Sequence, residues 1–133
     1  MNSDVPAILK ALGVQPTPQR IAVAEAVLLK EAHPSADQVW AEVKKACPTV
    51  SRATVYNTLN LLVKKRMLRT QVLRGGTIVF DRNMEAHHHF IDEESGAIHD
   101  IPWDSVEVQQ GPGLDGFEIL EYQVVMRGRR KRG

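Results

Sequence analysis

The chain has 133 residues, 43% of them hydrophobic, which is enough for one or two small domains with a buried core. No apolar run is long enough to span a bilayer, and Met1–Asp4 has neither the positive segment nor the apolar core of a signal peptide. The single cysteine, Cys47, cannot form an intramolecular disulfide. These features exclude a membrane protein and predict a soluble, cytoplasmic one.

The formal net charge of +1 hides a strong asymmetry along the chain. Residues 1–82 contain 12 Lys or Arg and 6 Asp or Glu, residues 83–126 contain no basic residue and 10 acidic ones, and residues 127–133 add 5 basic residues. A basic first part joined to an acidic second part predicts a polyanion-binding module attached to a different unit, with the join near Asp81.

Four helices are predicted in the first part. Apolar spacing indicates the first, and Gly13 follows its end. Thr17 places a capping hydroxyl before Pro18, and Ser35 with Gln38 has the spacing of a capping box. The predicted helices cover residues 4–12, 18–31, 36–47 and 52–67.

The helix predicted over residues 52–67 carries a functional signal. Its core stripe consists of Val55, Leu59, Leu62 and Val63. The adjoining face presents basic, amide and aromatic side chains around a small alanine: Arg52, Ala53, Tyr56, Asn57, Asn60 and Lys64. Such a face suits a helix that lies in a DNA major groove. Taken alone, the basic residues 64–66 are also compatible with a solvated helix end that the helix dipole favours.

A hairpin is predicted next, with strands at residues 68–73 and 77–80 and a turn at Gly75-Gly76. Helices followed by such a hairpin have the order of a winged helix. Arg69 and Arg74 beside the turn favour the nucleic-acid interpretation over the solvated helix end.

Beyond Asp81 the pattern predicts a small sheet. A hairpin joins residues 90–91 to 97–98, and a final strand covers residues 117–126, whereas residues 102–116 have no clear assignment. This part is too small for a generous core, so we expect its apolar face to pack against a second copy of the chain. The basic tail, 127–133, is predicted to be disordered and to add nonspecific attraction to phosphate.

Four of the five histidines lie between Asp81 and Asp100. Imidazole and carboxylate together suit iron, manganese or zinc. If this stretch is an extended strand, His87 and His89 share one face while His88 points to the other. A single metal ion between the two histidines and the two aspartates is therefore one interpretation; a solvated loop and a tag remnant are the others.

Four motifs, in the right order along nearly the whole chain, resemble the ferric uptake regulator family of bacterial transcriptional repressors. They lie at residues 16–20, 33–37, 51–59 and 81–100. The resemblance implies an α+β fold: a winged-helix DNA-binding domain at residues 1–81, a small α/β dimerisation domain at 82–126, and the basic tail. It also implies a metal, held between the domains, that sets the DNA-binding shape of the dimer.

The resemblance also implies roles for individual residues. The regulatory metal ligands implied are His33, Asp81, His87, His89 and Asp100, of which His33 is nominated by the resemblance alone. Arg52 and Tyr56 are implied to face bases and Arg20 to face phosphate. With the helix face described above, the predicted DNA-binding residues are Arg20, Arg52, Tyr56, Asn57 and Lys64.

Two departures from the family pattern change the metal prediction. Asp92 and Ser95 stand where most members have their first pair of zinc-binding cysteines, and no cysteine follows, so we expect no structural zinc. The second histidine-carboxylate site of the family is reduced to His88 and Glu107, a candidate second metal or haem site. The prediction is one divalent metal per subunit, Fe²⁺ or Mn²⁺, with Zn²⁺ as a substitute in vitro.

The resulting hypothesis is a homodimeric, metal-dependent repressor of peroxide-stress or iron-homeostasis genes that binds an A/T-rich palindromic operator in double-stranded DNA. The aspartates at 81 and 100 resemble the peroxide-sensing branch, whereas the histidine triplet resembles iron response regulators, some of which respond to haem. A regulator that answers iron or haem but not peroxide is therefore an alternative. A small metal-dependent hydrolase is disfavoured because a catalytic metal needs an open coordination position; we predict no enzymatic activity.

Overall fold

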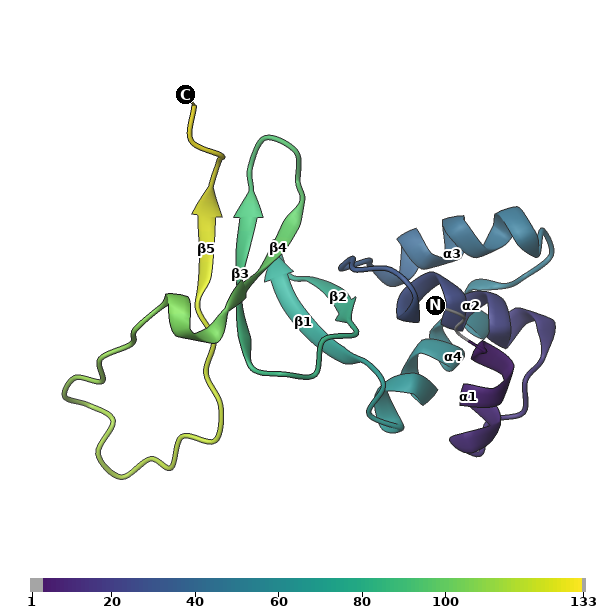
Figure 1. The fold of residues 1–133 in the computed structure, drawn as a ribbon, viewed down its shortest axis with the longest axis horizontal. Helices are drawn as coiled ribbons and strands as arrows, with labels where there is room; N and C mark the ends of the chain where they lie inside the picture. Colours follow the sequence, from purple (N-terminus) through teal and green to yellow (C-terminus); the bar gives the residue numbers. More distant parts are fainter. Residues whose placement is uncertain (1–3, 133) are drawn as a thin grey trace. The chain divides into compact units, whose positions relative to one another are not determined.

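The computed structural model describes residues 4–132 (Figure 1). The start of the predicted DNA-binding domain, at residues 1–3, and the last residue of the predicted tail, 133, lie outside the described part. Two compact units follow one another in sequence, and the boundary between them falls between Met84 and Glu85. No helix within residues 4–132 is long and apolar enough to cross a bilayer.

The first unit has the element order of a winged helix, which confirms the prediction of four helices and a hairpin. Its elements are α1 (Val5–Ala11), α2 (Pro18–Leu28), α3 (Ala36–Ala46), α4 (Arg52–Lys64), β1 (Arg69–Arg74) and β2 (Thr77–Asp81). The helices surround one hydrophobic core, which includes Leu9, Val23, Val27, Val39, Val43, Leu59, Leu62 and Phe80.

The predicted helix starts are confirmed by hydrogen bonds. Thr17 and Ser51 each accept the backbone N–H three residues later, at 3.2 and 3.1 Å. At α3 the capping box is complete: the Gln38 N–H donates to Ser35 Oγ at 3.2 Å, and the Ser35 N–H donates to Gln38 Oε1 at 2.9 Å. Side-chain caps therefore fix where α2, α3 and α4 begin.

Two helices end about three residues earlier than predicted. After α4, Arg66 has a φ of +63°, and the backbone N–H groups of Arg66 and Met67 donate to the carbonyls of Val63 and Leu62 at 3.0 and 2.9 Å. This is the bond pattern of a Schellman motif, with arginine at the position that glycine usually takes. The α2 helix ends at Leu28, residues 29–30 form a bend, and residues 31–34 belong to no helix or strand.

The face of α4 opposite the core is open. Val55, Leu59 and Leu62 are buried as predicted, whereas Val63 is only partly buried. Thr58 takes part in the buried stripe, and its Oγ1 donates to the Thr54 carbonyl at 2.8 Å. The residues of α4 predicted to face DNA are all exposed: Arg52, Ala53, Tyr56, Asn57, Asn60 and Lys64.

The hairpin packs back onto the chain before α3. Strands β1 and β2 pair antiparallel through a turn in which Gly75 and Gly76 have φ values of +52° and +83°, a conformation that favours glycine at both positions. The Phe80 N–H donates to the Pro34 carbonyl at 2.8 Å, and Ser35 forms a bridge with Val79. The side chain of Arg74 lies outside the described part.

The second unit is a three-stranded sheet with the order β4-β3-β5. Its elements are β3 (His87–Asp92), β4 (Ile98–Pro102), the 3-10 turn η1 (Trp103–Ser105) and β5 (Val125–Gly128). The β3–β4 pairing is antiparallel and confirms the predicted hairpin, whereas β5 runs parallel to β3. A parallel partner needs a long connection, which residues 106–124 supply.

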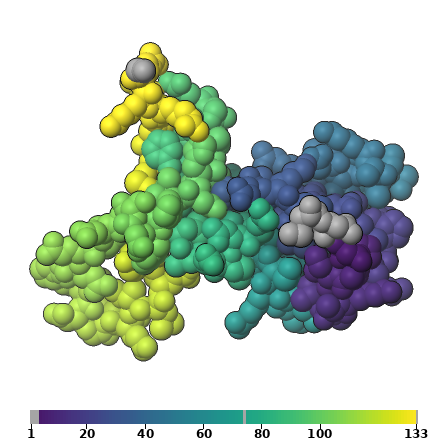
Figure 2. All heavy atoms as spheres, in the orientation of Figure 1, coloured from purple at the N-terminus to yellow at the C-terminus, as the bar shows by residue number. Residues whose placement is uncertain are grey.

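The prediction of a strand over residues 117–126 is wrong for most of its length. Only Val125–Gly128 pairs with β3, and residues 106–124 form an open loop whose atoms stand out as a lobe of the surface (Figures 1 and 2). Phe117 and Leu120 are 72% and 88% exposed. The strand also includes Arg127 and Gly128, so the predicted disorder of the tail is wrong at these two residues.

We expect Ser35→Ala to lower the free energy of unfolding of the first unit by about 1 kcal/mol, because an N-terminal N–H of α3 loses its acceptor. Gln38→Ala removes only the reciprocal bond and should cost less. Urea denaturation followed by circular dichroism measures both. Thr49→Ala, at an exposed position in the loop before α4, is the control, and equal stability of Ser35→Ala and this control would contradict the role of the capping box.

Candidate metal centre and DNA-facing surface

In the first unit, His33 and Asp81 lie side by side. The bridge between Ser35 and Val79 aligns the chain before α3 with the end of β2, so that His33 Nε2 lies 3.4 Å from Asp81 Oδ2. The other carboxylate oxygen of Asp81 accepts the Asn83 N–H at 2.9 Å. One imidazole nitrogen and one carboxylate oxygen thus face each other; we call this pair the first ligand set.

In the second unit, three side chains converge on one face of the sheet. His87 and His89 are two residues apart on β3 and therefore share one face, and Asp100 on β4 is the register partner of His89. The two Nε2 atoms are 3.0 Å apart, and they lie 3.4 and 3.5 Å from Asp100 Oδ1. Two nitrogens about 3 Å apart have the separation of neighbouring ligands about 2 Å from one ion. We call these three residues the second ligand set.

The outer nitrogens of the second ligand set are also engaged. His87 Nδ1 is hydrogen-bonded to the Glu85 carbonyl, and His89 Nδ1 to Gln123 Oε1 at 2.9 Å. Because both oxygens can only accept, each Nδ1 donates, and in a neutral imidazole this tautomer places the lone pair on Nε2. This is the tautomer of a metal-binding histidine, and such outer hydrogen bonds orient the ring. Nothing in the local sequence pattern indicates the contribution of Gln123.

His88 lies on the other face of β3 and makes different contacts. Its Nδ1 accepts the Val124 N–H at 2.9 Å, and its ring stacks on Trp103 with centroids 4.5 Å apart. Since Nδ1 accepts, the proton of the neutral ring is on Nε2, which is buried and has no hydrogen-bond partner within residues 4–132. In this arrangement neither nitrogen offers a lone pair to a metal.

Glu107 is exposed, and neither it nor His88 belongs to a group of three or more metal-binding side chains in the described part of the chain. The second metal or haem site stays a prediction, and it requires His88 to release the Val124 amide.

Asp92 and Ser95 stand at the positions expected for the first pair of zinc-binding cysteines, and hydrogen bonds close the turn that contains them. Asp92 Oδ1 accepts the N–H groups of Glu94 and Ser95 at 2.9 and 3.4 Å, and Ser95 Oγ accepts the Ala97 N–H at 3.1 Å. The Glu94 N–H is the main reason that the pKa of Asp92 is held below its usual value. This turn is therefore held without sulfur ligands.

The DNA-facing candidates differ in how they are held. Arg20, on α2, is partly buried and donates from Nη1 to the Gln15 carbonyl at 3.1 Å. Arg52 donates from Nη1 to Asp37 Oδ1 at 2.9 Å, and its guanidinium carbon lies 4.4 Å from the ring centre of Trp40. Sequence reasoning missed this role of Asp37 and Trp40, because it follows from the packing of α3 against α4.

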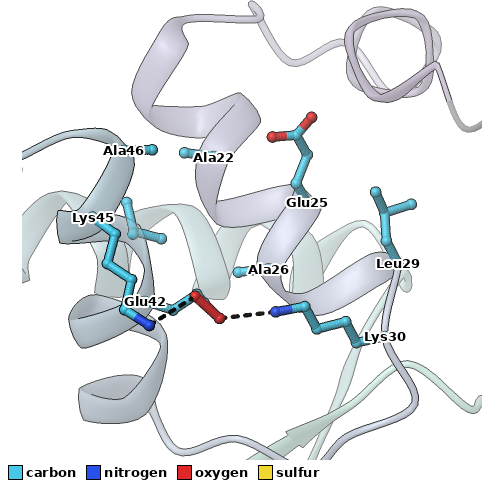
Figure 3. Close-up of a pocket in the computed structure, with 9 residues that line it drawn as sticks. Ala22, Glu25, Ala26, Leu29, Lys30, Glu42, Lys45 and Ala46 are labelled. Atoms are coloured by element: carbon cyan, nitrogen blue, oxygen red, sulfur yellow. Dashed lines mark hydrogen bonds and ion pairs between the residues drawn. The ribbon is translucent and has the colours of Figure 1, made fainter.

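Among the pockets of the first unit, two are similar in size. One, of about 330 Å³, lies between α2 and α3, and Glu42 there pairs with Lys30 at 2.8 Å and with Lys45 at 3.7 Å (Figure 3). The hydrogen bond from Lys30 is the main reason that the pKa of Glu42 is lowered. Its carboxylate is thus already engaged. The other pocket, of about 380 Å³, lies between the exposed face of α4 and the hairpin.

The family model described as the Ferric uptake regulator family matches residues 11–127. The chain belongs to the ferric uptake regulator family. It is 31% identical over 122 residues to the peroxide operon regulator of Bacillus subtilis, covering 90% of this chain and 84% of the relative. It is 28% identical over 124 residues to the peroxide-responsive repressor PerR of Staphylococcus epidermidis, covering 92% of this chain and 83% of the relative.

Solved structures show the same fold. The ferric uptake regulator of Vibrio cholerae matches with a TM-score of 0.72 at 22% identity, over 96% of this chain and 100% of that one. The peroxide stress regulator of Campylobacter jejuni matches with a TM-score of 0.62 at 23% identity, over 98% of each chain. The predicted family and α+β fold are confirmed. Members of this family are metal-dependent transcriptional regulators rather than enzymes, and they bind DNA operators, typically as dimers.

We expect His88→Ala to lower the free energy of unfolding by about 2–4 kcal/mol, because a buried ring and the acceptor of the Val124 N–H are both lost. The folded variant should keep the metal stoichiometry of the wild type, measured by anaerobic titration and elemental analysis. Loss of one metal equivalent without loss of stability would instead identify His88 as a ligand.

Proposed function

We propose that this protein is a homodimeric, metal-dependent DNA-binding repressor in which both ligand sets hold one Fe²⁺ or Mn²⁺ ion per subunit. The observation that carries the proposal is the second ligand set, where two Nε2 atoms and a carboxylate oxygen converge. Imidazole and carboxylate suit Fe²⁺ and Mn²⁺ and also accept Zn²⁺. The proposed ligands are His33, Asp81, His87, His89 and Asp100.

The two ligand sets have different tasks in this proposal. His87, His89 and Asp100 belong to one unit and bind the ion, whereas His33 and Asp81 belong to the other unit and connect it to the ion. An ion shared by both sets restrains the units relative to each other, which favours the arrangement that fits DNA. Metal binding and DNA binding must then strengthen each other by the same factor.

The exposed face of α4 is the proposed DNA reader. Arg52, Tyr56 and Asn57 face base edges in the major groove, and Arg20 and Lys64 add phosphate contacts. A dimer presents two such helices to the half-sites of an A/T-rich palindrome. Exposed apolar side chains of the second unit, such as Phe117 and Leu120, support a second copy as the covering partner.

Peroxide is the signal that we propose first. Both carboxylate ligands are aspartates, as in the peroxide-sensing branch, and the chain is similar to the peroxide operon regulator of B. subtilis. Bound Fe²⁺ would supply the redox chemistry by which H₂O₂ transfers one oxygen atom to a ligand histidine, with water as the other product, and the altered ring would no longer hold the units together. A regulator that answers iron or haem and ignores peroxide is the alternative, favoured by the histidine triplet.

His87→Ala should abolish metal-dependent operator binding while the fold is retained, because one of the convergent nitrogens is lost. His33→Ala should still bind metal through the second ligand set but lose the dependence of DNA binding on metal. Fluorescence anisotropy on a duplex selected with Mn²⁺-loaded wild-type protein measures both. His99→Ala, on β4 outside both ligand sets, is the matched control. Wild-type operator affinity in the His87 variant would disprove the proposed metal site.

A stoichiometric pulse of H₂O₂ should release the anaerobic Fe²⁺ form from DNA and leave the Mn²⁺ form bound. Mobility shift with apo, Mn²⁺ and Fe²⁺ protein measures this, and peptide mass spectrometry should find one added oxygen on His33 or His87. An Fe²⁺ form that stays bound, with unmodified histidines, would contradict peroxide sensing and support the iron- or haem-responsive alternative.

A further inference from the structure

Arg52, the first residue of α4, is held on two sides. Asp37 Oδ1 accepts from its Nη1 at 2.9 Å, and the indole ring of Trp40 lies against the guanidinium, 4.4 Å from Cζ to the ring centre. Both partners are on α3. The N-terminal residues of a recognition helix are the ones that reach base edges, so Arg52 occupies a position where orientation decides what it contacts.

The support for Arg52 is itself fixed. Trp40 Nε1–H donates to the Val50 carbonyl at 3.2 Å, which anchors the ring to the segment just before α4. Asp37 lies in the first turn of α3, whose start is set by the Ser35 capping box. Lys44 Nζ also lies 3.9 Å from the centre of the Trp40 ring. A flexible arginine is therefore placed against two anchored groups.

This arrangement does little for folding. The side chains of Arg52 and Asp37 are 58% and 60% exposed, and an ion pair this exposed contributes little to stability. A carboxylate on a surface that meets DNA also repels phosphate. Both facts favour a role for Asp37 in recognition rather than in the fold.

The chemistry of the held guanidinium favours a base over a phosphate. Asp37 accepts from Nη1 and leaves the other N–H groups of the planar fork available, and two parallel N–H groups match O6 and N7 of guanine. Asp37, Tyr56 and Asn60 help to line the nearby pocket of about 380 Å³, whose described lining residues also include Ser35, Thr70 and Thr77. A base edge finds amide and hydroxyl groups there.

We propose that Asp37 and Trp40 are positioning residues that aim Arg52 at a guanine in each operator half-site. The inference rests on the proposed DNA-binding function and adds the determinant of one base pair. Restricting the rotamers of Arg52 before binding raises the discrimination between guanine and other bases, because less freedom is lost when the correct base is met.

The test is a selection from random duplexes with the full-length, Mn²⁺-loaded protein, followed by anisotropy on the selected duplex and on versions with each guanine replaced. We expect the wild type to prefer one guanine per half-site by about tenfold over adenine. Arg52→Ala should lose this preference, Asp37→Asn should reduce it several-fold, and Asp37→Glu should restore most of it. In the Arg52→Ala background, Asp37→Asn should have no further effect.

Controls separate positioning from structure and from charge. Lys64→Ala, on the same helix, should weaken binding to all duplexes alike and leave the base preference unchanged. Thermal melting of Asp37→Asn checks the fold, and Trp40→Leu provides a second route to the same loss of preference. An unchanged guanine preference in both Asp37→Asn and Trp40→Leu would overturn the inference. If the wild type selects no duplex with any metal, the proposed function itself fails.

Discussion

The pairing of the chain before α3 with strand β2 is the contact on which both candidate functional surfaces of the first unit depend. The Phe80 N–H to Pro34 carbonyl bond and the Ser35–Val79 bridge fix residues 33–37 against the hairpin. His33, at one end of this segment, thereby lies beside Asp81, while Asp37, at its other end, holds Arg52. Five consecutive residues thus connect the first ligand set with the DNA-facing helix, and Ser35 between them caps α3.

Neighbouring histidines on β3 lie on opposite faces of the sheet and therefore make different contacts. His87 and His89 direct their Nε2 atoms toward Asp100, whereas His88, one residue out of phase, accepts the Val124 amide and stacks on Trp103. The same residue type is a ligand candidate or a packing element according to the face of β3 on which it lies. The triplet therefore consists of two ligand candidates and one histidine that attaches the chain entering β5 to the sheet.

Local signals in the sequence were enough to predict the helix starts, the hairpin turn and the common face of His87 and His89, because caps, turn residues and alternation act over a few positions. Contacts that depend on distant segments were not predictable. His33 meets Asp81 through a backbone pairing across more than forty residues, and Gln123 bonds to His89 from the far end of a loop. The alternation of residues 117–124 predicted a strand, but β3 pairs only with Val125–Gly128 on that edge. Arg66 follows the end of α4 with a positive φ, and an arginine in the sequence does not predict that conformation.

In the proposed mechanism, the free energy needed to shift the equilibrium between arrangements determines which ligands must couple metal binding to DNA binding. Moving a two-state equilibrium from 1:99 to 99:1 requires that the ion bind the DNA-competent arrangement about 10⁴-fold more tightly, or about 5.5 kcal/mol. An ion held only by His87, His89 and Asp100 has the same affinity in every arrangement of the two units and shifts nothing, however tightly it binds. The discrimination must therefore come from His33 and Asp81, the only proposed ligands whose distance from the second set changes with the arrangement. The proposed mechanism thus assigns affinity and coupling to different ligand sets.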